Sequence, residues 1–111
     1  MDTRTKIIAR ADAILRLQDE NLLAVRIDCD PLSAGLARKL NAYGRPLLAV
    51  LSEKQESYLA TQARAELAAS LAVVRYVTID ADLAVAEDLR REEETWRGEL
   101  ESVVLAKSRM Q

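Results

Sequence analysis

Amphipathic and apolar segments alternate along this chain of 111 residues. Four segments carry their apolar side chains at helical spacing, three or four residues apart: 5–18, 32–43, 54–72 and 81 to near the C-terminus. Three short runs between them are rich in Leu, Val and Ile, which is typical of buried strands: 22–29, 46–51 and 73–80. The pattern therefore predicts the order α-β-α-β-α-β-α.

Short apolar strands that alternate with amphipathic helices imply a parallel sheet with right-handed crossovers and helices on both faces. The predicted fold class is α/β, a small Rossmann-like three-layer α/β/α sandwich with a long C-terminal helix. The length allows one domain over 1–111, with a Rossmann-like core over 5–80 and the C-terminal helix over 81–111. In such sheets ligands bind beyond the carboxyl ends of the strands, at the point where the strand order reverses.

The stretch CDPLSAGL, residues 29–36, follows the first strand at that edge. Asp30 before Pro31 predicts a helix start, with the aspartate as N-cap and the proline at the first helical position. Gly44 stands where the C-cap of the same helix belongs.

Composition narrows the possible partners and chemistry. Hydrophobic residues make up 50% of the chain and charged residues 31%, which indicates a folded domain. The net charge of −2 gives no support for binding nucleic acid. No apolar run approaches the roughly 18 residues of a membrane span, so we expect a soluble cytoplasmic protein with no membrane partner.

The chain has no histidine and one cysteine, Cys29. The commonest general base and metal ligand is therefore missing, and we expect no metal site. A nucleophilic cysteine needs a nearby base, so the prediction for Cys29 is a small buried apolar residue.

CDPLSAGL resembles, without a gap, the signature Phe-Asp-x-x-His-x-Gly-His of the cytidylyltransferase-like nucleotidyltransferases. This family includes glycerol-3-phosphate cytidylyltransferase and the adenylyltransferase domain of ADP-heptose synthase. PLLAVLSE (46–53) is similar to the family's second strand, and ARAELAASLAVVRYVTI (63–79) to its segment RAELLAALxxVDYVV. The resemblance covers roughly residues 5 to 80.

The departures from the family fall on its chemistry. The two signature histidines contact the triphosphate and stabilise the charge that develops as pyrophosphate leaves, whereas their positions here hold Ser33 and Leu36. The phosphate-binding Lys-Gly and Arg-Pro pairs after the second strand are missing, as is the later Ser-Thr-rich motif. The resemblance thus implies an ancestral nucleotide site, with CTP or ATP and Mg²⁺ as ligands if binding is retained, at Asp30, Ser33, Gly35, Leu36 and Arg64.

Structural alternatives stand beside these assignments. Asp30 serves equally well as a helix cap, Gly35 as a point of close packing, and Arg64 as a solvated residue on a helix face. Arg26 and Asp28 lie in an otherwise apolar strand, on the same side of it. They form either a self-satisfying pair or a remodelled polar site.

The C-terminal segment carries Leu89, Trp96, Val103 and Met110 seven residues apart, and Leu100 widens this stripe. Such spacing resembles a coiled-coil seam. It predicts a homodimer or partner interface through Leu89, Trp96, Leu100 and Val103. The alternative is that this stripe packs on the protein's own sheet.

Two functions follow. The first is a degenerate, non-catalytic nucleotidyltransferase-like protein that acts through protein interaction or self-association. The second is a nucleotidyltransferase that transfers a cytidylyl or adenylyl group to a sugar or polyol phosphate, or a nucleotide-binding protein with a remodelled site. Loss of one hydrogen-bond donor that stabilises charge in the transition state, as the signature histidines do, typically lowers the rate about 10²–10³-fold. The absence of two favours the first function.

Overall fold

The computed structural model describes residues 3–54 and 56–98. Its elements are η1 (Thr3–Lys6), α1 (Arg10–Asp19), β1 (Leu23–Arg26), α2 (Ala34–Ala42), β2 (Leu47–Leu51), α3 (Thr61–Ala69), β3 (Val74–Ile79) and β4 (Glu87–Asp88). Residues 90–98 are again helical. None of the helices in these ranges is long and apolar enough to cross a membrane.

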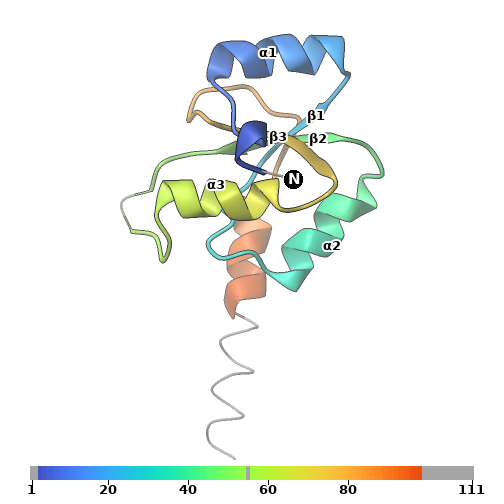
Figure 1. Cartoon of the computed structure of the whole chain (residues 1–111). Coiled ribbons are helices and arrows are strands. Elements are labelled where there is room, and N and C mark those ends of the chain that lie inside the picture. Colours follow the sequence, from blue (N-terminus) through green and yellow to red (C-terminus); the bar gives the residue numbers. More distant parts are fainter. Residues whose placement is uncertain (1–2, 55, 99–111) are drawn as a thin grey trace, which may run out of the picture.

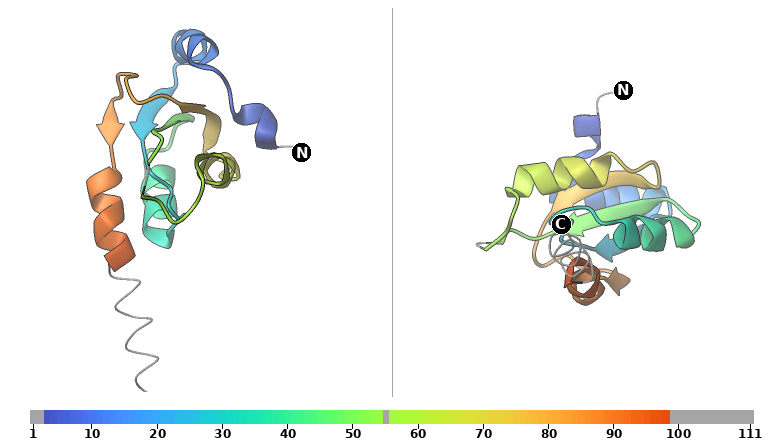
Figure 2. Two further views of the ribbon diagram at one scale, coloured as in Figure 1. Left: turned by 90° about the vertical axis from the view of Figure 1, so that its left-hand side faces the viewer. Right: turned by 90° about the horizontal axis from the view of Figure 1, so that it is seen from below.

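The strands of the described residues form one parallel sheet in the order β3-β2-β1-β4. The chain proceeds outward from β1 to β2 and β3, which are labelled in Figure 1, then returns to the opposite side of β1 for β4, the orange arrow in the left view of Figure 2. The order therefore reverses between β1 and β4, where Arg26 is in register with Asp88. This arrangement confirms the α/β class and is compatible with a small Rossmann-like fold.

Alternate strand residues supply two hydrophobic clusters, one on each face of the sheet. Val25 and Ile27 belong to the larger cluster, together with residues of α2 and α3. Ala24 belongs to the second cluster, together with Ala13 of α1. Figure 2 shows α1 and the 90–98 helix at opposite ends of the molecule, so the 90–98 helix lies near the carboxyl ends of the strands.

The prediction of a helix from residue 81 onward is wrong over 81–89, where the chain is extended and contains β4. Without this segment, β1 would be an edge strand with unpaired backbone groups, and residues 86–89 supply hydrogen bonds to them. The Ala86 N–H donates to the Ala24 carbonyl at 2.9 Å, and the Leu89 N–H to the Arg26 carbonyl at 2.9 Å. The helix begins only after Asp88, whose carboxylate accepts from the Arg90 N–H at 3.1 Å. Residues 99–111 of the predicted helix lie outside the described residues.

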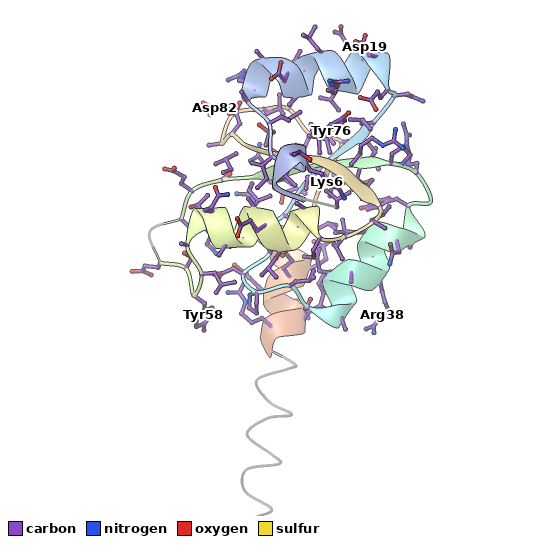
Figure 3. All side chains as sticks on the ribbon, in the orientation of Figure 1. Lys6, Asp19, Arg38, Tyr58, Tyr76 and Asp82 are labelled. Carbon is purple, nitrogen blue, oxygen red and sulfur yellow. The ribbon has the colours of Figure 1, made fainter. Side chains whose placement is uncertain are left out.

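The other elements occur in the predicted order with shorter bounds. The helix predicted from residue 5 begins at Arg10, because the segment before it pairs with the other sheet edge. Ile7 forms a parallel bridge with Val77 of β3. Lys6, labelled in Figure 3, donates to the Val74 carbonyl at 3.0 Å. Gly44 ends α2 with a φ of 66°, as its predicted capping role requires.

The packing of 81–89 can be tested with Leu83, which is 8% exposed in the second cluster. Leu83→Ala should lower the free energy of unfolding by about 2 kcal/mol or more, since it removes buried methyl groups. The control is Leu15→Ala, at a site that is 58% exposed on α1, which should stay within about 0.5 kcal/mol of wild type. Urea denaturation measures both, and equal small effects would contradict the observed packing.

Candidate functional site

A cleft of about 750 Å³ opens where the strand order reverses. Its lining comes from the ends of three strands and from the 90–98 helix: Asp28 after β1, Ser52, Glu53 and Lys54 after β2, Asp88 of β4, and Arg90, Arg91, Glu92 and Glu94 of the helix. We call it the switch-point cleft. Its position is the one at which open α/β sheets bind ligands.

Arg26 and Asp28 do not pair with each other. β1 ends at Arg26, so the loop and not the strand sets the direction of the Asp28 side chain. The Asp28 carboxylate lies 3.3 Å from the Lys54 ammonium, at the rim of the switch-point cleft. The buried Arg26 guanidinium instead donates to the Ser52 hydroxyl at 2.8 Å and to the Asp80 carbonyl at 2.9 Å. Arg26 therefore ties the ends of three neighbouring strands together.

Asp30 does not cap α2, contrary to the prediction. Ser33 is the N-cap, and its hydroxyl oxygen accepts from the Leu36 N–H at 3.0 Å. The buried Asp30 carboxylate accepts from the N–H groups of Tyr58 and Leu59 at 3.0 and 2.8 Å. It thereby holds the loop between β2 and α3, at whose tip Tyr58 projects outward (Figure 3).

Arg64 is fully buried, so the interpretation of a solvated helix residue is wrong. Its guanidinium donates to the Asp28 carbonyl at 2.9 Å and to the Ser52 carbonyl at 2.6 Å. These carbonyls belong to the loops that follow β1 and β2. The two terminal nitrogens of Arg64 therefore cross-link the two loops. Its Nε has no hydrogen-bond partner, but it is buried and closed to a phosphate at the surface.

Gly35 is a point of close packing. A Cβ at this position would lie 2.8 Å from the ring of Trp96. The indole therefore rests on the first turn of α2, and Figure 2 shows the 90–98 helix beside α2. Leu36, the other signature position, is fully buried in the larger cluster.

The predicted interface stripe is partly internal. Leu89 is 2% exposed within the larger cluster, and Trp96 packs against the same cluster. Leu89 therefore belongs to the protein's own core and the partly buried Trp96 packs against it, as the alternative interpretation holds. Leu100 and Val103 lie outside the described residues.

Glu93 is a site residue that the sequence does not single out. Its buried carboxylate accepts from the Asp28 N–H at 2.7 Å and from the Cys29 N–H at 2.8 Å, one bond to each oxygen. Cys29 has a φ of 53°, a left-handed conformation that helps direct successive N–H groups to one anion. Burial raises the pKa of Glu93 above its usual range, while the two amide hydrogen bonds oppose this effect. The local sequence does not indicate that Glu93 is buried, because this residue lies among the alternating charges of residues 87–101.

Cys29 is buried, as predicted. Burial, assisted by the negative charge of Glu93, raises the pKa of the thiol to about 12. The thiol therefore stays protonated at neutral pH and is a poor nucleophile. Within residues 3–54 and 56–98, no group of three or more His, Cys, Asp or Glu side chains is placed to hold a metal ion.

Comparisons of this chain with protein-family models, with curated proteins and with solved structures find no match. The nucleotidyltransferase resemblance therefore stays a prediction.

The Gly35–Trp96 contact predicts a change of sign between two backgrounds. Gly35→Ala should destabilise the wild type by about 1 kcal/mol or more, because the added methyl group overlaps the indole ring. In a Trp96→Ala background the clash is absent, and the same change should stabilise α2 slightly, by less than the roughly 0.5–1 kcal/mol of a helix interior, because Gly35 lies in the first turn. Urea denaturation of the four proteins measures this, and effects of equal sign in both backgrounds would contradict the contact.

Proposed function

We propose that this chain is a nucleotidyltransferase-like domain that does not catalyse nucleotidyl transfer and acts in the cytoplasm through protein interaction. The observation that carries the proposal is the position of Glu93 and Trp96. Both come from the chain's own 90–98 helix, and both lie on the stretch where the resemblance expects the triphosphate.

The expected phosphate site is largely occupied or covered by groups of the chain itself. The amides that follow β1 are held by Glu93, and Gly35 is covered by Trp96. The Ser33 oxygen accepts a helix N–H, and Arg64 donates to loop carbonyls. A phosphate at this edge would meet the like charge of the Glu93 carboxylate, which is least screened where the group is buried.

The proposed interaction is self-association as a homodimer through the C-terminal segment. Leu89 is buried and Trp96 packs against the chain's own core. This part of the proposal therefore rests on Val103, which continues the seven-residue stripe beyond the described residues, and on Leu100, which widens it.

The alternative function is nucleotide binding in the switch-point cleft. The cleft volume of about 750 Å³ favours it, since small-molecule sites span about 300–1,000 Å³. The charges disfavour it. Lys54 is paired with Asp28 and Arg90 with Asp88. Carboxylates outnumber cations in the lining, so a nucleotide would need Mg²⁺ to approach.

Calorimetric titration with CTP and ATP, with and without Mg²⁺, separates the two functions. We expect no saturable heat with either nucleotide, because the amide pair and Gly35 are covered. Micromolar binding would contradict the proposal. If it occurs, Lys54→Ala locates it: loss of binding assigns the nucleotide to the switch-point cleft. The matched control is Lys39→Ala on the exposed side of α2, which should leave any binding unchanged.

Self-association is tested by sedimentation velocity over a range of protein concentrations. We expect a dimer for the wild type and a monomer for the Leu100→Ala, Val103→Ala double variant, because the apolar stripe is shortened. Leu15→Ala, an exposed apolar site on α1, serves as the control and should remain dimeric. A wild type that stays monomeric at every concentration would refute the dimer while leaving the nucleotide result to be judged separately.

A further inference from the structure

The contact between Glu93 and the loop after β1 has the geometry of an anion-binding site. Two successive backbone N–H groups, of Asp28 and Cys29, donate to the two oxygens of one carboxylate at 2.7 and 2.8 Å. Concave pairs of backbone amides of this kind bind oxyanions in many loops. Here the anion is supplied by the chain itself.

The charged neighbours of Glu93 act on its carboxylate in opposite directions. The positive charge of Arg97, one turn along the same helix, favours the ionised form of Glu93. The Asp30 carboxylate also borders the site, but the amides of Tyr58 and Leu59 hold it. A cavity lined by Asp30, Glu93 and Arg97 has a volume of only about 20 Å³, so an external anion reaches the two amides only when the Glu93 side chain leaves them.

Opposing effects act on the ionisation of the Glu93 carboxylate. The two amide hydrogen bonds favour the ionised carboxylate, whereas its burial disfavours it and raises its pKa. The Asp28 charge adds to the unfavourable side. Loss of the Glu93 carboxylate leaves the N–H groups of Asp28 and Cys29 without their partner, and an anion that takes its place restores the two hydrogen bonds.

We propose that the amides of Asp28 and Cys29 form an oxyanion-binding site whose internal ligand is Glu93, and that this ligand latches the 90–98 helix to the sheet edge. A free small oxyanion, a carboxylate or a phosphate, competes with Glu93 for the same two amides. The inference goes beyond the proposed function, because it rests on the Glu93 contacts alone and holds whether or not the chain is catalytic.

Release of the latch has a structural consequence at Gly35. Trp96 lies three residues after Glu93 on the same helix and covers Gly35. A helix that loses the Glu93 contact keeps the packing of Trp96 and the contact of Arg97 with the Tyr58 ring, but no longer has its bonds to the loop after β1. An oxyanion that binds the amide pair therefore shifts the population toward a state in which the first turn of α2 is uncovered.

The experiment removes the Glu93 carboxylate from the two amides and adds small anions to the solution. Glu93→Ala and the matched control Glu92→Ala, an exposed neighbour of the same charge, are unfolded thermally in sodium acetate, sodium phosphate or sodium chloride at constant ionic strength. Acetate should stabilise Glu93→Ala in proportion to the logarithm of its concentration. Above its dissociation constant, each tenfold increase in acetate should raise the ratio of folded to unfolded protein about tenfold. Glu92→Ala and the wild type should show no such increase, because Glu93 occupies their site.

The measurement in sodium phosphate shows which class of anion the site accepts. Stabilisation by acetate and phosphate extends the site to phosphate groups, and stabilisation by acetate alone restricts it to carboxylates. The proposal is overturned if neither anion stabilises Glu93→Ala more than it stabilises Glu92→Ala.

If Glu93→Ala does not fold, Glu93→Gln provides the test, because its amide oxygen can accept only one of the two N–H bonds. Acetate should then shift the backbone amide resonances of Asp28 and Cys29 in Glu93→Gln. Unshifted resonances at both positions would overturn the proposal equally.

Discussion

The backbone groups at the carboxyl edge of the sheet must be satisfied, and much of the structure depends on how this is achieved. Strands that end inside a protein leave carbonyls and loop amides that are costly to bury without partners. Arg26 and Arg64 donate to the carbonyls, and Asp30 and Glu93 accept from the amides. All four of these charged side chains are buried. The edge is therefore closed by the chain's own charges.

This closure connects the fold to the proposed function. In an α/β protein with an open edge, a bound ligand satisfies loop amides at the switch point. Here the 90–98 helix brings Glu93 to the amides after β1 and Trp96 to Gly35. The segment that ends the described chain thus takes the place that a ligand would otherwise fill, and the polar region that stays open is the switch-point cleft beside it.

The sequence predicted the parts of the fold that local patterning determines. β1, β2 and β3 are apolar runs, and α2 has a clear stripe and a terminal glycine, so their order followed directly. β4 could not be predicted, because its two residues, Glu87 and Asp88, are exposed and charged and pair only because β1 offers a free edge. Glu93 was missed for a similar reason, since a glutamate within a charged helix gives no local sign that it will be buried by another segment.

Asp30 and Arg64 explain why the candidate site was harder to predict than the fold. A phosphate site and a closed strand edge require the same residue types, namely cations near carbonyl-rich strand ends and acids near loop amides. The family resemblance drew attention to both residues, but the sequence could not tell a group that faces a ligand from one that faces the backbone. That distinction depends on whether another segment covers the edge. In this chain the covering segment is the 90–98 helix, whose docking is set by long-range contacts of Glu93 and Trp96 and by no pattern near residue 30.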